Sequence, residues 1–185
     1  QTEDATCNYS YSAGVYRVRI QDNSGSGTGF PRIYFNGGCD SQKLISINQW
    51  GTGQWSSMAH AFQGCANLSG GASDTPKLTN VTDMNHMFSG AKVFNQWIGD
   101  LDTSMVNDMS YMFKSARAFN QPIGDWETGS VTNMSHMFDD ASSFNQPIGS
   151  WHTTLVNNMS NMFVESSDFN QPIGGWDTSK VEYMD

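Results

Sequence analysis

Apolar and polar positions recur along this chain at a fixed spacing of 25 residues. The hexapeptide Phe-Asn-Gln-Pro-Ile-Gly begins at Phe119, Phe144 and Phe169, and a copy with tryptophan in place of proline begins at Phe94. A constant period of this size is typical of proteins in which repeats stack, because one repeat cannot bury its apolar face alone. We therefore expect each repeat to form one coil of a stack.

The first half of each repeat carries apolar residues at helical spacing. Val81, Met84, Met87 and Phe88 follow the i, i+3, i+6, i+7 pattern of two helical turns. An acceptor side chain suited to a helix N-cap stands directly before the first methionine, and the pattern therefore predicts a short helix in each coil. These acceptors are Asp83, Asp108, Asn133 and Asn158.

The second half, Phe-Asn-Gln-Pro-Ile-Gly, has too much proline and glycine for a helix. It predicts a short extended segment that stacks in parallel on its neighbours, about 4.8 Å apart. Its asparagine side chain is expected to bond to the next asparagine or to the backbone of the next coil. This asparagine recurs as Asn95, Asn120, Asn145 and Asn170. The predicted fold class is thus α/β, a right-handed solenoid with one short helix and one short strand in each coil.

Methionine and phenylalanine are concentrated at the repeat positions, with nine of the 11 methionines and eight of the 11 phenylalanines there. This concentration assigns them to a continuous core rather than to a metal-binding or calmodulin-like surface. Cys65 stands where later repeats have Ala91, Ala116 and Ala141, which predicts a buried thiol.

The sequence divides into three parts. Residues 1–29 contain alternating apolar and polar positions and a Gly/Ser-rich linker, and their tyrosine and glycine pattern resembles the closing strands of PKD and immunoglobulin-like domains. They are expected to form a β-rich cap over the first coil or the tail of such a domain. Residues 30–77 form degenerate N-terminal repeats, and residues 78–185 form the regular ones.

The net charge of the chain argues against a nucleic-acid partner, and its hydropathy argues against a membrane-spanning helix. The net charge of −9 and the pI of about 4.6 argue against nucleic acid, which needs a basic face. No apolar run reaches the ~20 residues that a membrane-spanning helix needs. Only 15% of residues are charged, and the abundance of Asn, Ser, Thr, Gly and Gln favours an extracellular protein.

No arrangement of residues points to catalysis or to a bound cofactor, since the chain has neither a Ser-His-Asp spacing nor a Gly-rich phosphate loop. His86 and His136 share a repeat position but lie two coils apart, roughly 10 Å, which is too far for one zinc ion. The carboxylates beside the tryptophan position are weak candidates for calcium, with a solvated acidic surface as the alternative. They are Asp100, Asp102, Asp125 and Glu127.

Three further groups are candidates for binding or modification. Exposed, stacked indoles at Trp126, Trp151 and Trp176 would form a sugar-binding platform, whereas Leu101 at the same repeat position favours burial. Cys7 and Cys39 lie outside the regular repeats and are the disulfide candidates of a secreted protein. The sequons most independent of the repeat itself, and therefore the N-glycosylation candidates, are those at Asn8, Asn67 and Asn80.

Residues 131–153 follow closely a known repeat unit, Val-Thr-Asn-Met-Ser-x-Met-Phe-x-x-Ala-x-x-Phe-Asn-Gln-x-Ile-x-x-Trp-Asp-Thr-Ser. Residues 61–68 are similar to the treponemal-type Ala-Phe-x-x-Cys-x-x-Leu. Over about residues 30–185 the chain resembles the BspA-like leucine-rich-repeat surface proteins, whose 25-residue unit also occurs in mycoplasma lipoproteins. Departures from the unit are Trp97 for proline, Leu101 for tryptophan and His152 for aspartate.

The resemblance implies a leucine-rich-repeat-like fold and a secreted or surface-anchored protein that acts in adhesion, and it supplies no catalytic residues. We expect a non-catalytic module that binds a protein or glycan ligand on a host cell or in the matrix. The alternative is a structural subunit of an extracellular filament assembled end to end. The sequence stops partway through a coil, at Asp185. This predicts either a fragment of a longer array or self-association through the open C-terminal coil.

Overall fold

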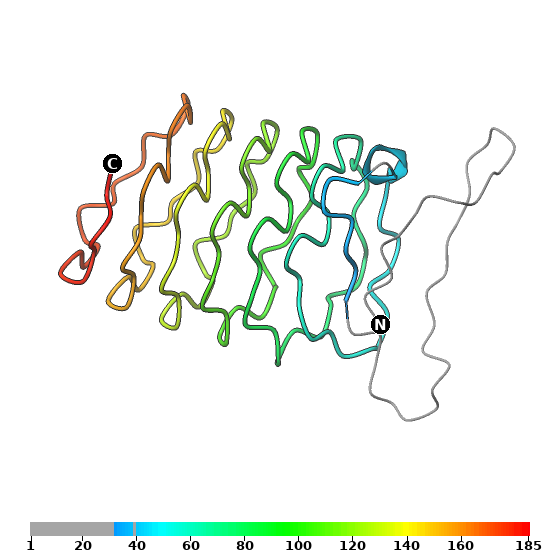
Figure 1. Ribbon diagram of the computed structural model, residues 1–185, viewed down its shortest axis with the longest axis horizontal. Coiled ribbons are helices and arrows are strands. Elements are labelled where there is room, and N and C mark those ends of the chain that lie inside the picture. The colour runs from blue at the N-terminus through cyan, green and yellow to red at the C-terminus, as the bar shows by residue number, and fades with distance from the viewer. Residues whose placement is uncertain (1–31, 39) are drawn as a thin grey trace, which may run out of the picture.

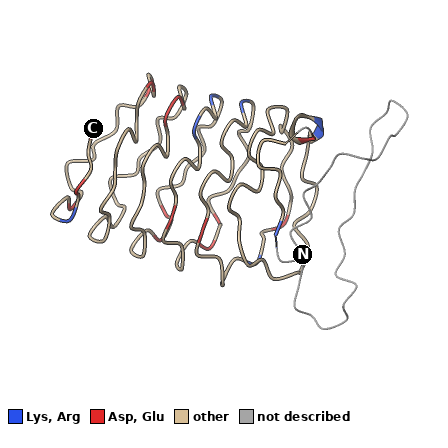
Figure 2. Cartoon of the chain, in the orientation of Figure 1, with Lys and Arg blue, Asp and Glu red and all other residues tan. Residues whose placement is uncertain are grey.

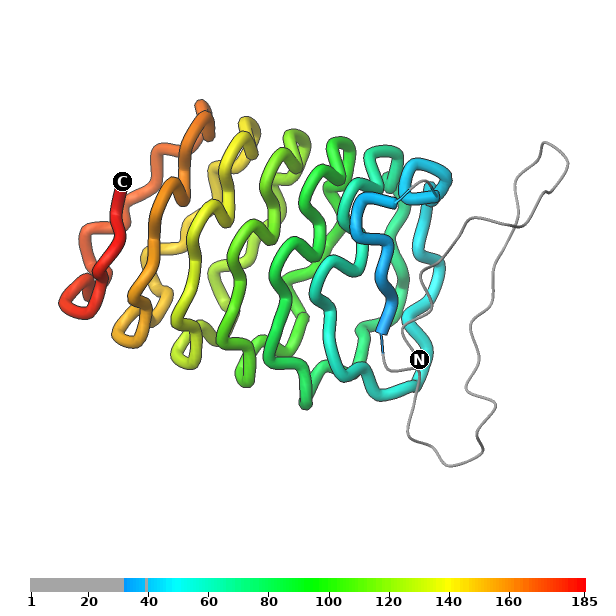
Figure 3. Tube along the Cα trace, in the orientation of Figure 1, coloured from blue at the N-terminus to red at the C-terminus, as the bar shows by residue number. Residues whose placement is uncertain are grey.

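The computed structural model describes residues 32–38 and 40–185, and these form a row of coils stacked side by side (Figure 1). The tube in Figure 3 shows each coil beside the one before it, from the blue N-terminal end to the red C-terminal end. Isolated parallel bridges join positions 25 residues apart, such as Asp83 with Asp108 and Asp108 with Asn133. The sequence period is therefore the distance in sequence between neighbouring coils.

The predicted α/β solenoid with a β-rich cap is wrong. Within the described residues, the single helix is the 3-10 helix η1 (Ser41–Lys43), and the strand pairing consists of isolated bridges with no sheet. The segments in which helices were expected are built from turns, and those in which strands were expected are extended or irregular chain that ends in a turn. The region predicted to hold the cap, residues 1–29, lies outside the described residues.

The expected helices are replaced by turns in which alternate N–H groups bond in two directions. The Met87 N–H donates to the Met84 carbonyl at 3.1 Å, within the coil, whereas the Phe88 N–H donates to the Met112 carbonyl of the next coil at 2.9 Å. Three-residue turns return a side chain to the interior at almost the spacing of a helix. The apolar pattern therefore correctly predicts the inward face of this segment and wrongly predicts a helix.

The backbone also blocks helix propagation. The residue three positions after the Asx residue of each regular turn takes a left-handed conformation, with φ of 54° at His86, 58° at Tyr111 and 53° at His136. A left-handed residue cannot continue a right-handed helix. The predicted N-caps act in the turn instead, as in Asp108, whose Oδ1 accepts the Ser110 N–H at 2.8 Å.

Side chains take over the inter-coil bonding in the second half of each coil. Asn120 Oδ1 accepts the Asn145 N–H at 3.0 Å and the Gln146 Nε2 at 2.8 Å. The same bonds link Asn145 to Asn170, at 2.9 Å from the Asn170 N–H. The predicted bonding between the asparagine side chains and the next coil is confirmed. It explains why a Pro-containing segment stacks without a strand ladder.

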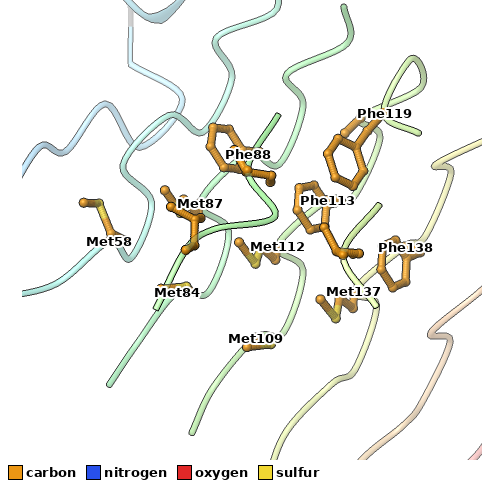
Figure 4. Close-up of a cluster of buried hydrophobic side chains, with 14 of the residues drawn as sticks. Met58, Met84, Met87, Phe88, Met109, Met112, Phe113, Phe119, Met137 and Phe138 are labelled. Atoms are coloured by element: carbon orange, nitrogen blue, oxygen red, sulfur yellow. The ribbon is translucent and has the colours of Figure 1, made fainter. Parts of the chain in front are cut away.

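The interior is a continuous column of methionine and phenylalanine, part of which Figure 4 shows. Met109, Met134 and Phe138 are all 0% exposed, which confirms their assignment to the core. Phe113 and Phe138 stack with ring centroids 5.7 Å apart and planes 7° apart. Equivalent rings thus pack on one another along the whole stack, so that each coil buries the apolar face of its neighbour.

The early coils are less regular than the later ones. The bridges there join Ser46 with Gly70 and Gln54 with Lys77, at spacings shorter than the later period. The stretch between Gly70 and Leu78 therefore differs in path from its later counterparts. No helix of the described part of the chain is long and apolar enough to cross a membrane.

Candidate functional site

One aromatic ring from each of five successive coils stacks into a file along one side of the molecule. We call Tyr34, His60, His86, Tyr111 and His136 the ring ladder. His60 and His86 stack with centroids 4.7 Å apart, and the two steps through Tyr111 are each 4.5 Å. Tyr34 meets His60 edge to face at 5.7 Å. The rings are half-buried except for Tyr34, which is exposed, so their edges are open to solvent.

The same turn that excludes a helix positions these rings. His60, His86, Tyr111 and His136 all occupy the left-handed position of their turns. Histidine is one of the residue types that tolerate this conformation better than most. The sequence analysis considers His86 and His136 only as candidates for a shared metal site, which their spacing excludes, and does not identify Tyr111, which fills the gap between them. Their shared repeat position was the available signal.

Two histidines of the ladder are oriented by a partner three residues later in the same turn. His60 Nδ1 lies 2.8 Å from Gln63 Oε1, and His136 Nδ1 lies 2.8 Å from Asp139 Oδ2. Lys114, which lies beside Tyr111, forms an ion pair with the same Asp139. An N–H at Nδ1 leaves Nε2 of each imidazole as a hydrogen-bond acceptor.

The electrostatics of the ladder differ along its length. At His86, partial burial and then the neighbouring His60 lower the pKa of the imidazole, with Lys114 adding to the effect and Asp108 opposing it. At Asp139, partial burial acts to raise the pKa of the carboxyl, but the hydrogen bonds from Lys114 and His136 outweigh it and the pKa is lowered. Burial therefore disfavours the charged form of His86, whereas the other end of the ladder lies beside the Lys114–Asp139 ion pair.

Figure 2 shows acidic and basic positions at both ends of the coils. The Arg117 guanidinium donates to Asp140, with Nη2 2.8 Å from Oδ2. Exposed pairs of this kind add little stability.

The predicted tryptophan platform lies largely in the core. Trp126 and Trp151 are each 4% exposed, and their indoles stack 6.5 Å apart. Trp151 Nε1 donates to the Ile123 carbonyl at 3.1 Å. Trp176, in the last complete coil, is half-buried. The faces of Trp126 and Trp151 are covered by neighbouring coils and cannot stack on a sugar. The prediction of burial, which rests on Leu101 at the same repeat position, is therefore confirmed for these two residues.

The stack is bent, because equivalent rings are not equally spaced on its two sides. Neighbouring indoles are 6.3–6.5 Å apart in the tryptophan column, against 4.5 Å between Tyr111 and His136. The paired rings are nearly parallel, so these values approximate the local repeat distance. A stack bends toward the side with the shorter repeat distance, which places the ring ladder on the concave side.

The predicted calcium ligands do not converge. Asp102 Oδ1 accepts the Ser104 hydroxyl at 2.6 Å, and Asp100 Oδ2 accepts Trp97 Nε1 at 2.9 Å. Asp125 and Glu127 are exposed in the next coil. Within residues 32–38 and 40–185, no three His, Cys, Asp or Glu side chains are grouped so that they could hold a metal ion.

The cysteine and sequon predictions divide between the described and undescribed parts of the chain. Cys65 is a buried free thiol, and burial raises its pKa to about 12. Asn67 and Asn80 are exposed, and Asn67 Nδ2 donates to the Gln42 carbonyl at 2.8 Å. The remaining candidates, Cys7, Cys39 and Asn8, lie outside the described residues.

Comparison with known proteins identifies one family. The family model described as "Mycoplasma protein of unknown function, DUF285" matches residues 35–128, 56–154 and 123–185. The three matches overlap and together include every regular coil. No curated protein matches the chain.

Proposed function

This chain belongs to the DUF285 family of mycoplasma proteins of unknown function, and from its geometry we propose that it is a non-catalytic recognition module. It binds a protein or glycan ligand of a cell surface or matrix through the ring ladder and the charged turns beside it. Its place of action is extracellular, either secreted or anchored at the cell surface. The resemblance of its repeat to those of BspA-like surface proteins supports this location.

The observation that carries the proposal is the contrast between constant and variable columns within the one chain. The inward columns repeat a single residue type, such as the phenylalanine of Phe88, Phe113 and Phe138. Three residues beyond the ladder, the residue type changes in every coil, as Gln63, Ser89, Lys114, Asp139 and Val164. Gln63 and Lys114 are half-buried and Val164 is exposed, whereas Ser89 and Asp139 are buried. A uniform interior beside a varied column that reaches the surface in three of these coils favours display of a specific surface.

The shape of the stack supports the same function. Repeat proteins bind along the concave surface that their small per-repeat rotation creates. The ring ladder lies on that side, and tyrosine is enriched among the residues that dominate binding energy. Backbone bonds between coils hold the rings in place, as between His86 N–H and the Ser110 carbonyl at 3.0 Å. A ligand therefore meets a surface that is ordered before binding.

The test begins with an array of extracellular-matrix proteins and glycans probed with the purified chain. Any ligand found is then titrated against Tyr111→Ala, Tyr111→His and Ser130→Ala. Tyr111→His keeps a ring at a position that is histidine in the neighbouring coils, and Ser130 is exposed on a different column. Truncation to alanine at a binding hot spot typically costs about 2 kcal/mol or more, which is roughly thirtyfold in affinity.

We expect Tyr111→Ala to lose at least about tenfold in affinity, and the other two variants to stay within about threefold of the wild type. Melting temperatures of the three variants are measured alongside, so that loss of folding is separated from loss of contact. Equal binding by Tyr111→Ala and the wild type would place the recognition surface elsewhere. Failure of every arrayed ligand to bind would count against recognition as the function.

The alternative function is a structural subunit of an extracellular filament assembled end to end. Light scattering over a range of concentrations tests it, because the particle size of an assembling subunit grows with concentration, whereas that of a recognition module does not.

A further inference from the structure

A cavity of about 90 Å3 lies where the regular repeat is interrupted. The stretch 72–76 forms one part of its lining, and Trp97, Ile98, Asp100 and Leu101 form another. Trp50 completes it. The cavity therefore joins the irregular N-terminal coils to the first regular one, and none of its residues belongs to the ring ladder.

Two of the lining residues are the points at which this coil departs from the repeat. Trp97 stands where the later coils have Pro122, Pro147 and Pro172, and it is 56% exposed. Leu101 stands where the later coils have the tryptophan that fills the same part of the coil. Compared with the later coils, this coil therefore has its indole at the rim of the cavity, at Trp97, and has the smaller side chain of Leu101 at the interior position.

Two carboxylates in the lining are held in place by neighbouring N–H groups. The oxygens of Asp74 accept the Trp50 and Gly51 N–H groups at 2.8 and 2.9 Å. Asp100 Oδ2 accepts Trp97 Nε1 at 2.9 Å. Each carboxylate retains lone pairs beyond these bonds. Among the ion pairs of residues 32–38 and 40–185, none involves Asp74 or Asp100, and the cavity lining contains no lysine, arginine or histidine.

We propose that this cavity binds an organic ammonium group. Two indoles and two unpaired carboxylates offer such a group cation–π attraction and opposite charge at once, and tryptophan is the best aromatic partner for a cation. The protein's net charge of −9 also favours the approach of a cation. Anions are disfavoured by the same two carboxylates.

The size of the cavity limits the ligand to a head group. Sites for whole drug-sized ligands begin at about 300 Å3, several times the volume found here. A methylated or primary ammonium on an alkyl chain fits this description, whether it comes from a choline-type head group or from a lysine side chain. The shared chemistry is a compact cation on an apolar stem.

The test titrates the full chain with choline chloride and with 3,3-dimethylbutan-1-ol, in which a neutral tert-butyl group replaces the trimethylammonium. Binding is measured by calorimetry and by tryptophan fluorescence. A third titration with n-butylammonium represents the lysine side chain. The variants are Trp97→Pro, which restores the residue of the later coils, and Asp100→Asn. Asp125→Asn is the matched control, because it removes the same charge at the same repeat position one coil later.

We expect choline or n-butylammonium to bind at least about tenfold more tightly than the neutral alcohol, and Trp97→Pro to lose about tenfold. Asp100→Asn should weaken binding several-fold, and Asp125→Asn should leave it unchanged. Whichever cation binds more tightly identifies the source of the head group. Equal binding of the cations and the alcohol would overturn the proposal, as would equal effects of Asp100→Asn and Asp125→Asn or saturable binding of neutral sugars alone.

Discussion

His86 stacks face to face on Tyr111, with ring centroids 4.5 Å apart and planes inclined by 11°. On its other side His86 stacks on His60 at 4.7 Å. A proton on His86 would place a charge in a partly buried file of rings next to a second imidazole. The neutral form of His86 is therefore the form that the stack favours, and its lowered pKa has the same cause.

The free energy of unfolding should consequently fall as the pH is lowered, because the folded chain disfavours protonation of His86. A histidine whose pKa is lower in the folded than in the unfolded chain stabilises the fold fully above the unfolded value of about 6.5, and that contribution is lost as the pH falls below it. The groups that act on His86 are His60 and Lys114, which oppose its protonation, and Asp108, which favours it. The melting temperature, measured from about pH 7.5 to about pH 5, reports the effect.

The matched variant is His86→Tyr. Tyrosine already occupies the equivalent left-handed position at Tyr111, with φ of 58°, so the ring file is preserved without a group that titrates in this range. We expect the variant to melt with a shallower dependence on pH than the wild type. A His86→Tyr variant with an unchanged acid slope would show that other groups cause the loss.

A second prediction concerns the thiol of Cys65. The rise of its pKa from 9.0 to about 12 reduces the thiolate about a thousandfold, and burial blocks access to the sulfur. In a Cys7→Ser, Cys39→Ser background, we expect no reaction with a thiol reagent such as 5,5′-dithiobis(2-nitrobenzoic acid) at neutral pH. Urea-unfolded protein should react fully within the same time. Rapid labelling of the folded chain would contradict the closed core around Cys65.

The sequence predicts the period, the interior and the bonding of the asparagines, because all three depend on which residues face inward. It does not reveal the left-handed backbone at residues such as Tyr111 and Ser115, for which no local propensity exists. Bonds such as that from Phe88 N–H to the Met112 carbonyl offset that unfavourable conformation, and they depend on the whole stack. The predicted helix failed for this reason.

The sequence likewise predicts only part of each candidate site. The residues of the ring ladder share one repeat position in the sequence, but the stacking of their rings depends on the close spacing of the coils on that side. The cavity beside Trp97 was visible only as two departures from the repeat, Trp97 and Leu101. Their position in the same cavity lining as Asp74 requires the irregular path of the chain before Leu78, which no period predicts.

A third prediction tests the asparagine bonds between coils. Asn145 Oδ1 accepts the Asn170 N–H and Gln171 Nε2, both at 2.9 Å. Asn145→Ala removes the acceptor from both donors and should lower the free energy of unfolding by about 1–3 kcal/mol. Asn170→Ala is the control, because among the described residues Asn170 joins these bonds through its backbone N–H, which alanine retains, and the change should cost less than about 0.5 kcal/mol. Urea denaturation measures both, and equal losses would argue against the inter-coil role.

The last prediction addresses the left-handed backbone directly. Ser115 has φ of 56°, while Gly64 and Gly90, at the same place in earlier coils, have φ of 74° and 73°. A side chain in this conformation costs roughly 1–2 kcal/mol relative to glycine, and the added freedom of glycine in the unfolded chain offsets part of the gain. Ser115→Gly should therefore raise the free energy of unfolding by about 0.5–1 kcal/mol, as measured in urea.

Ser115→Ala distinguishes backbone strain from loss of the hydroxyl. Alanine keeps the Cβ that clashes in the left-handed region, so this variant should be no more stable than the wild type. A gain in Ser115→Gly alone assigns the effect to the backbone. The Ser115 N–H donates to the Asp139 carbonyl of the next coil, and both variants retain this bond. A destabilised Ser115→Gly would mean that the inter-coil bonds impose no strain here, and would contradict the explanation given for the absence of helix.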